Sequence, residues 1–190
     1  MNDVERKIIV AITGASGFCY VSNLLTKLEE TSVRRENIVV IFSENGKLVA
    51  EQEAGKSAVH NIFSRFPIYE NQDMMVAPAS GSSDYDTMIV APCSMGTLAS
   101  IASGLASNLI TRTADVMLKE RRRLILVTRE TPLNLIHIEN MLAVTRAGGI
   151  ICPASPSFYF HPVSLNALIS TVSERILSLA EINYPLQRFK

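Results

Sequence analysis

Short apolar runs alternate with amphipathic stretches along this chain, and this alternation limits the fold more than any other feature. Residues 8–12 (IIVAI) form a β-branched apolar run, a glycine-rich turn follows at 13–17, and an amphipathic stretch covers 20–28. An apolar run bounded by turn residues predicts a buried strand, and 3.6-residue periodicity predicts a helix. Repetition of this unit predicts an α/β fold whose parallel strands are joined by right-handed crossovers.

The same alternation continues to the end of the chain. Strands are expected at 7–12, 37–42, 86–91, 124–128 and 150–152, and helices at 20–28, 44–54, 94–104, 108–121, 134–147 and 164–180. The segment 55–83 contains scattered Pro, Gly and Ser residues and predicts loop with short structure. We therefore expect one domain over residues 1–190, with a Rossmann/flavodoxin-like three-layer fold: a mostly parallel sheet with helices on both faces. The tail 183–190 carries Tyr184 and Phe189, and we expect it to dock on a neighbouring subunit.

Composition excludes several classes of protein. Eighteen basic residues balance eighteen acidic ones, so no overall field attracts nucleic acid or anionic lipid. No apolar run approaches the ~18 residues of a membrane span, and the first run is too short for a signal peptide, so a cytoplasmic location is expected. Cys19, Cys93 and Cys152 have no CxxC spacing, which predicts reduced thiols and no metal site.

Ligands of open parallel sheets bind at the carboxyl ends of the strands, where the strand order reverses. Two predicted strands end there in small, hydroxylated loops, at 13–17 (TGASG) and 92–97 (PCSMGT). Each loop leads into a helix N-terminus, where backbone N–H groups and the helix dipole favour an anion. Either loop alone could be a turn with a capping hydroxyl. Together they suggest two anion cups for a phosphorylated cofactor.

The run 12–18 (ITGASGF) also resembles the opening of a short-chain dehydrogenase. The third glycine of that nucleotide turn is replaced by Tyr20, and no tyrosine is followed four residues later by lysine. The chain therefore lacks the Tyr and Lys pair that a dehydrogenase of this class uses for proton transfer.

Basic residues form a second pattern. Arg112 and Lys119 are seven residues apart and share a helix face, and Arg129 with Glu130 follows a predicted strand at the edge of the two loops. Such cations could hold a second phosphate. Residues 121–123 (RRR) are expected to be a solvated helix end. Glu130 could be an ion-pair partner of Arg129 or a carboxyl that changes its protonation state.

Five motifs in order carry a resemblance to a known family. They are 14–17 (GASG), 92–95 (PCSM), 109–122 (LITRTADVMLKERR), 129–133 (RETPL) and 156–159 (PSFY). Together they resemble the flavin prenyltransferases of the UbiX type over almost the whole chain. Members of that family join a dimethylallyl group from dimethylallyl monophosphate to N5 and C6 of reduced FMN. The prenylated FMN is used by UbiD-type decarboxylases.

The resemblance implies roles for individual residues. The FMN site would be formed by Gly14, Ala15, Ser16, Ser43, Ser94, Met95, Gly96, Thr97 and Arg129. The prenyl phosphate would be held by Arg112, Lys119, Tyr159 and Arg175. The catalytic residues would be Ser16, whose hydroxyl could relay a proton near flavin N5, Glu53 and Glu130. No metal is implied, and the chain has only five Asp residues, none of them adjacent, so it lacks the DDxxD clusters that bind magnesium in prenyl-diphosphate enzymes. The chain departs from the family at Gly96, Ser83 and Phe189, which concerns the finer prenyl-pocket contacts.

Two alternatives stay open alongside the prenyltransferase. A flavin-dependent decarboxylase of the same fold would need an active-site histidine near the first helix and a PxMNxxMW segment, and this chain has neither. A non-catalytic FMN-binding subunit would keep the glycine and serine loops without needing the cations. The resemblance also implies a homododecamer with sites between subunits.

Overall fold

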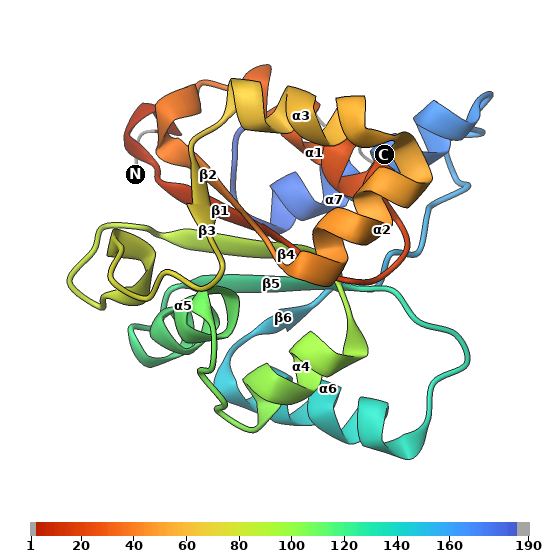
Figure 1. The fold of residues 1–190 in the computed structure, drawn as a ribbon. Coiled ribbons are helices and arrows are strands. Elements are labelled where there is room, and N and C mark those ends of the chain that lie inside the picture. The colour runs from red at the N-terminus through yellow and green to blue at the C-terminus, as the bar shows by residue number, and fades with distance from the viewer. Residues whose placement is uncertain (1–2, 186–190) are drawn as a thin grey trace.

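A six-stranded, fully parallel sheet forms the centre of the molecule (Figure 1). The computed structural model describes residues 3–185. The strands lie in the order β3-β2-β1-β4-β5-β6, so the direction of chain progression reverses between β1 and β4. Their bounds are β1 Ile8–Ile12, β2 Ile38–Phe42, β3 Ile68–Glu70, β4 Thr87–Cys93, β5 Arg123–Thr128 and β6 Ile150–Ile151. In a sheet of this order, the carboxyl ends of β1 and β4 mark the place for a ligand.

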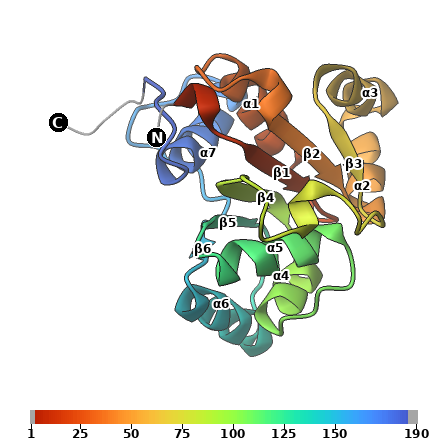
Figure 2. The same ribbon diagram turned by 90° about the vertical axis from the view of Figure 1, so that its left-hand side faces the viewer.

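Helices cover both faces of the sheet, as the two views in Figure 1 and Figure 2 show. One face carries α1 (Phe18–Glu29), α2 (Glu44–Ala54), α3 (Lys56–Arg65) and α7 (Leu165–Leu179). The other carries α4 (Met95–Ala102), α5 (Leu109–Lys119) and α6 (Leu135–Ala147). Short 3-10 turns lie at η1 (Asp3–Glu5), η2 (Arg35–Asn37) and η3 (Ala77–Ala79). The expected three-layer α/β fold is confirmed.

The two cores follow from the alternation of side chains along the strands. In β1, Ile8, Val10 and Ile12 belong to the core beneath α1 and α7, whereas Ile9 and Ala11 belong to the core beneath α4 and α5. All five residues are buried because helices cover both faces. This double burial explains why the strand is apolar throughout and shows no polar alternation.

The sequence predicted five of the six strands but not α3 and β3, which lie between β2 and β4 along the chain. The segment 55–83, expected to be mainly loop, contains α3 and β3. The helix had a signal, because Val59, Ile62, Phe63 and Phe66 follow the i, i+3, i+4, i+7 spacing. The strand β3 is only three residues long and partly exposed at the sheet edge, which left little pattern to detect.

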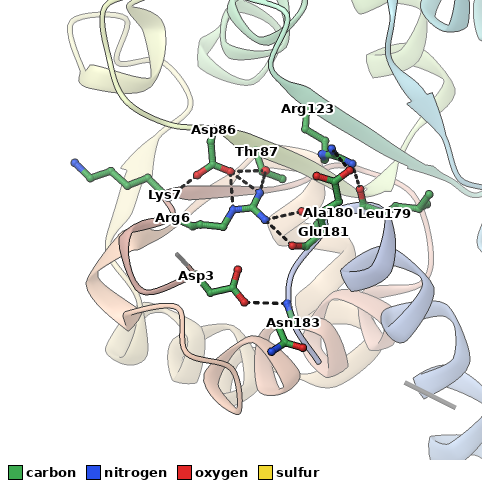
Figure 3. A network of polar contacts seen from close by, with 10 residues as sticks. All are labelled: Asp3, Arg6, Lys7, Asp86, Thr87, Arg123, Leu179, Ala180, Glu181 and Asn183. Carbon is green, nitrogen blue, oxygen red and sulfur yellow. Dashed lines mark hydrogen bonds and ion pairs between the residues drawn. The ribbon is translucent and has the colours of Figure 1, made fainter. Parts of the chain in front are cut away.

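Two arginines tie the end of α7 to the amino-terminal edge of the sheet (Figure 3). The buried Arg6 guanidinium donates to the Asp86 carboxylate and to the carbonyl oxygens of Ala180 and Glu181. Arg123 donates to the Leu179 carbonyl and pairs with the Glu181 carboxylate. These contacts satisfy the carbonyl groups that a helix leaves unpaired at its C-terminus.

The prediction of a solvated RRR run was therefore wrong in part. Arg121 is exposed, as expected. Arg122 donates to the Gly81 carbonyl at 2.8 Å, and Arg123 is committed to α7. The prediction failed because of tertiary contacts. Arg123 is the first residue of β5, so Arg122 and Arg123 lie between neighbouring elements.

The start of the tail packs on its own chain. The Tyr184 hydroxyl donates to the Glu30 carboxylate at 2.7 Å and accepts from Lys27 at 3.0 Å. Docking of the tail on a neighbouring subunit remains a prediction, because Phe189 lies outside the described residues.

Residues 3–185 include no helix long and apolar enough to cross a bilayer. In the same part of the chain, no group of three or more His, Cys, Asp or Glu side chains is placed to hold a metal ion. Cys19, Cys93 and Cys152 are free thiols.

Candidate active site

The two predicted anion loops meet at the switch point, and a threonine side chain joins them. The Thr13 hydroxyl donates to the Pro92 carbonyl at 2.8 Å and accepts from the Ser94 N–H at 2.8 Å. The Thr13 N–H also donates to the Pro92 carbonyl at 3.2 Å. The loop after β1 and the loop after β4 therefore form one continuous rim at the carboxyl edge of the sheet.

The first loop is not an open anion cup, because the protein supplies its own anion there. The Glu53 carboxylate, from α2, accepts hydrogen bonds from the Gly17 N–H at 3.0 and 3.1 Å and from the Phe18 N–H at 2.8 Å. These groups form the N-terminus of α1, where a negative charge is favoured by the helix dipole. The expectation of two free cups is thus corrected in part: Glu53 occupies the Gly17 and Phe18 amides of the first loop.

The surroundings of Glu53 keep it ionised. Partial burial raises the pKa of its carboxyl group, but the Ser16 hydroxyl, the N–H groups of Phe18 and Gly17, and the charge of Arg129 outweigh burial and lower the pKa overall. Glu53 is thus a carboxylate next to the hydroxyl that the resemblance places beside the flavin.

Arg129 lies at the same rim, and its Nε–H group makes no hydrogen bond within residues 3–185. It follows β5, and its Cγ comes within 4.0 Å of the point where a Cβ on Gly17 would lie. Its Nε atom is also buried. A buried donor without a partner is costly, so an acceptor supplied by a ligand would stabilise this arginine.

The second loop is an open cup. Ser94 caps α4 by accepting from the Thr97 N–H, which leaves the N–H groups of Met95 and Gly96 without hydrogen-bond partners in the described part of the chain. A Cβ on Gly96 would meet nothing within 4 Å, so this turn faces open space. Ser43, the cap of α2, lies at the same place and accepts from the Gly46 N–H at 3.0 Å.

A polar hollow of about 120 Å³ lies between these caps and the start of α5. It is lined by Ser43, Asn71, Gly96, Thr97, Ser100, Asn108, Ile110 and Thr111. No lining residue is charged, so the N-termini of the surrounding helices set its electrostatic character, which favours an anion. The hollow has room for a phosphate group, whereas a three-ring flavin would have to lie outside it, along the rim.

Sequence reasoning missed Asn71, which closes this hollow on one side. Its backbone carbonyl accepts from the Leu109 N–H at 2.8 Å, and its side-chain oxygen accepts from the Ile110 N–H at 3.1 Å. Asn108 accepts from the next two amides of α5, those of Thr111 and Arg112. The α5 N-terminus is therefore fully hydrogen-bonded. No local motif marks Asn71, because its partners lie about 40 residues further along the chain.

The residues assigned to the prenyl phosphate do not all lie at this rim. Arg112 donates to the Ala79 carbonyl at 3.1 Å and pairs with Asp115 at 2.8 Å, so it faces η3. Lys119 ends α5 beside Glu120 and Gly81, at the amino-terminal edge of the sheet. The six residues of β5, which span about 20 Å, separate that edge from Arg129.

Arg175 lies on α7, on the face of the sheet opposite α5, and Glu130 and Tyr159 lie in the segments that follow β5 and β6. Tyr159 is exposed in the segment between β6 and α7. Arg175 projects from α7 close enough to Cys152 that its charge acts against the effect of burial, which raises the pKa of that thiol. Glu130 is exposed just after β5 and accepts from the Thr131 N–H at 3.0 Å. One copy of the chain thus separates Arg112 and Lys119 from Tyr159 and Arg175.

This arrangement suits a nucleotide-like cofactor such as FMN. A phosphate could take the free amides of Met95 and Gly96, and a ring system along the rim could pair with the unsatisfied Nε of Arg129. The fold and this site define an α/β protein that binds a phosphorylated cofactor at the sheet's switch point. A family model described as Flavoprotein matches residues 1–176.

More specific relatives identify the family. A protein of Methanocaldococcus jannaschii named flavin prenyltransferase UbiX is 41% identical over 180 residues, covering 95% of this chain and 96% of its own. The crystal structure of AnUbiX (PadA1) in complex with FMN and dimethylallyl pyrophosphate has a TM-score of 0.88 and 40% identity, covering 97% of this chain and 99% of that one. A dodecameric FMN-dependent UbiX-like decarboxylase from Escherichia coli O157:H7 has a TM-score of 0.90 and 39% identity, with the same coverage. The chain belongs to the UbiX flavin prenyltransferase family.

Proposed function

We propose that this protein joins a dimethylallyl group to reduced FMN, with dimethylallyl monophosphate as the donor. The proposal rests chiefly on one observation: a carboxylate is held ionised beside Ser16, while the amides of Met95 and Gly96 remain free at the same sheet edge. FMN needs groups that bind its phosphate, and alkylation of its ring needs a base that accepts a proton. Both kinds of group lie at this edge of the sheet. Family membership at about 40% identity supports the same reaction.

When bound, reduced FMN supplies the electron-rich N5 and C6 atoms that become alkylated. The Ser94–Thr97 turn and Ser43 would hold the phosphate of FMN, and Gly14, Ala15 and Arg129 would border its ring. Glu53, ionised and next to Ser16, can accept a proton through that hydroxyl as the new bonds form. Glu130 would be a second proton acceptor at the end of β5.

Departure of the prenyl phosphate requires fixed positive charge at the breaking C–O bond, which leaves its electron pair on the phosphate. Lys119, Arg112, Arg175 and Tyr159 are the groups that we assign to this task. Because Lys119 lies at the opposite edge of the sheet and the Arg112 side chain is turned toward η3, we propose that a second copy brings these cations to the site. This requirement agrees with a homododecamer, the assembly named for the Escherichia coli relative.

The product, prenylated FMN, would pass to a UbiD-type decarboxylase. The reaction can be tested anaerobically by mixing the protein with reduced FMN and dimethylallyl monophosphate and measuring flavin mass. We expect the flavin to gain one C5H8 unit, with dimethylallyl pyrophosphate as a parallel donor. A flavin mass that never changes with either donor would contradict the proposal.

The substitution Arg175→Ala distinguishes the proposed enzyme from a flavin-binding subunit without catalytic activity. Loss of turnover with retained FMN binding is expected if Arg175 holds the leaving phosphate. If turnover is unchanged, the phosphate is held elsewhere.

A further inference from the structure

We propose that Asn71 is a ligand of the flavin phosphate and that it couples this phosphate to the position of α5. This inference rests on the proposed function, because it assumes that FMN places its phosphate in the hollow lined by Ser43, Gly96 and Thr97. It adds a residue outside the recognised motifs and gives that residue two simultaneous tasks.

The first task is visible in the contacts of Asn71. Its backbone oxygen and its Oδ1 atom accept from two successive amides of α5, those of Leu109 and Ile110. Only 8% of Asn71 is exposed, and its Oδ1 bond is fully buried. This two-point contact fixes the start of the helix that carries Arg112.

The second task follows from the remaining half of the side chain. With Oδ1 committed to Ile110, the amide nitrogen Nδ2 is left as a donor, and it makes no hydrogen bond to any residue in the range 3–185. Asn71 lines the hollow together with Gly96, whose N–H has no hydrogen-bond partner in the described part of the chain. A donor without a protein partner that lines an electropositive hollow is available to an anionic acceptor.

The α5 N-terminus itself cannot fill that role. Its first four amides are occupied by Asn71 and Asn108, so this helix offers no free N–H group to a phosphate. The helix can therefore contact the flavin through side chains that line the hollow at its start, and Asn71 is the more buried of the two asparagines there, the other being the cap Asn108. Binding of the phosphate by Nδ2 would hold the Oδ1 atom, and with it the start of α5, in the geometry seen here.

Asn71→Asp separates the two tasks. The aspartate keeps an oxygen that can accept from Ile110, and its charge is favoured at a helix N-terminus, so the apoprotein should melt at the same temperature or higher. The same change removes the donor and places a negative charge against the flavin phosphate. Asn134→Asp is the matched control, because Asn134 caps α6 by accepting from the His137 N–H and does not line the hollow.

The experiment titrates the apoprotein with FMN and with riboflavin, which lacks the phosphate, and follows quenching of flavin fluorescence. We expect Asn71→Asp to weaken FMN binding about tenfold or more and to change riboflavin binding less than about twofold, with Asn134→Asp altering neither. Equal weakening of both flavins, or unchanged FMN affinity, would overturn the assignment.

Two further results keep the test decisive. If Asn71→Asp fails to melt cooperatively, Asn71→Ser replaces it, with the same expected selectivity for FMN over riboflavin. If the unaltered protein binds neither flavin, the proposed function fails together with this inference. Flavin binding that is independent of the residue at position 71 would overturn the inference alone.

Discussion

Replacing Glu53 with Gln tests the idea that the protein supplies its own anion at the N-terminus of α1. The carboxylate accepts from Gly17 and Phe18 at 2.8 to 3.1 Å, and Gln would keep one acceptor oxygen while losing the charge. Losing a cap contact costs about 0.5–2 kcal/mol, and losing a favourable helix-dipole interaction costs about 0.3–1 kcal/mol. Water screens the exposed side of Glu53, so we expect the free energy of unfolding to fall by about 1–2 kcal/mol.

Urea denaturation of the apoprotein at pH 7 measures this loss, which corresponds to about 2–8 °C in melting temperature for a chain of this length. Because the pKa of Glu53 is lowered in the folded state, its stabilisation is complete above its unfolded pKa of about 4.3 and is lost as the pH falls through the folded value. The difference between the unaltered protein and Glu53→Gln should therefore be constant from pH 6 to 8, in the range of about 1–2 kcal/mol, and shrink below about pH 4.5. A Gln variant as stable as the unaltered protein at pH 7, or a difference that does not shrink in acid, would show that the Glu53 charge does not stabilise the N-terminus of α1.

The remaining predictions concern packing and the contacts of Arg6 at the end of α7. Arg6→Met should lower the free energy of unfolding by about 3–5 kcal/mol in urea titrations, because it leaves the Asp86 carboxylate and the last carbonyls of α7 without their buried partner; a loss below about 1 kcal/mol would contradict this role. Gly46→Ala should destabilise the protein by about 1–3 kcal/mol, since its Cβ would come within 2.3 Å of the Ile12 carbonyl oxygen. Gly96→Ala, with nothing within 4 Å of its Cβ, should instead stabilise the apoprotein by about 0.4–1 kcal/mol in the same assay. Equal effects of the two glycine substitutions would show that packing does not set the difference.

Local sequence patterns predicted the parts of the site that depend on neighbouring residues. Ser43 and Ser94 cap helices that begin directly after apolar strands, so both the strand and its cap were visible in short windows. Their meeting at one edge followed from the topology of parallel sheets. The position of the rim could therefore be predicted from the sequence.

Contacts between distant segments could not be predicted in the same way. Glu53 reaches the N-terminus of α1 from α2, and no spacing rule says which carboxylate fills a helix end. Asn71 is likewise defined only by where α5 begins in space. The position of Lys119 was available from topology, since a helix that leads into a parallel strand ends at the amino-terminal edge of the sheet.

A mixture of two inactive variants tests most directly whether two copies of the chain build each reaction site. Arg129→Ala removes the flavin half, and Lys119→Ala removes the phosphate half that we assign to the second copy. When equal amounts are assembled together, random pairing should leave about a quarter of the sites with both halves intact, and prenylated FMN should be formed at about that fraction of the normal rate. If the mixture makes no product while the unaltered protein does, both halves come from one chain, and the proposal of a site built by two copies is wrong.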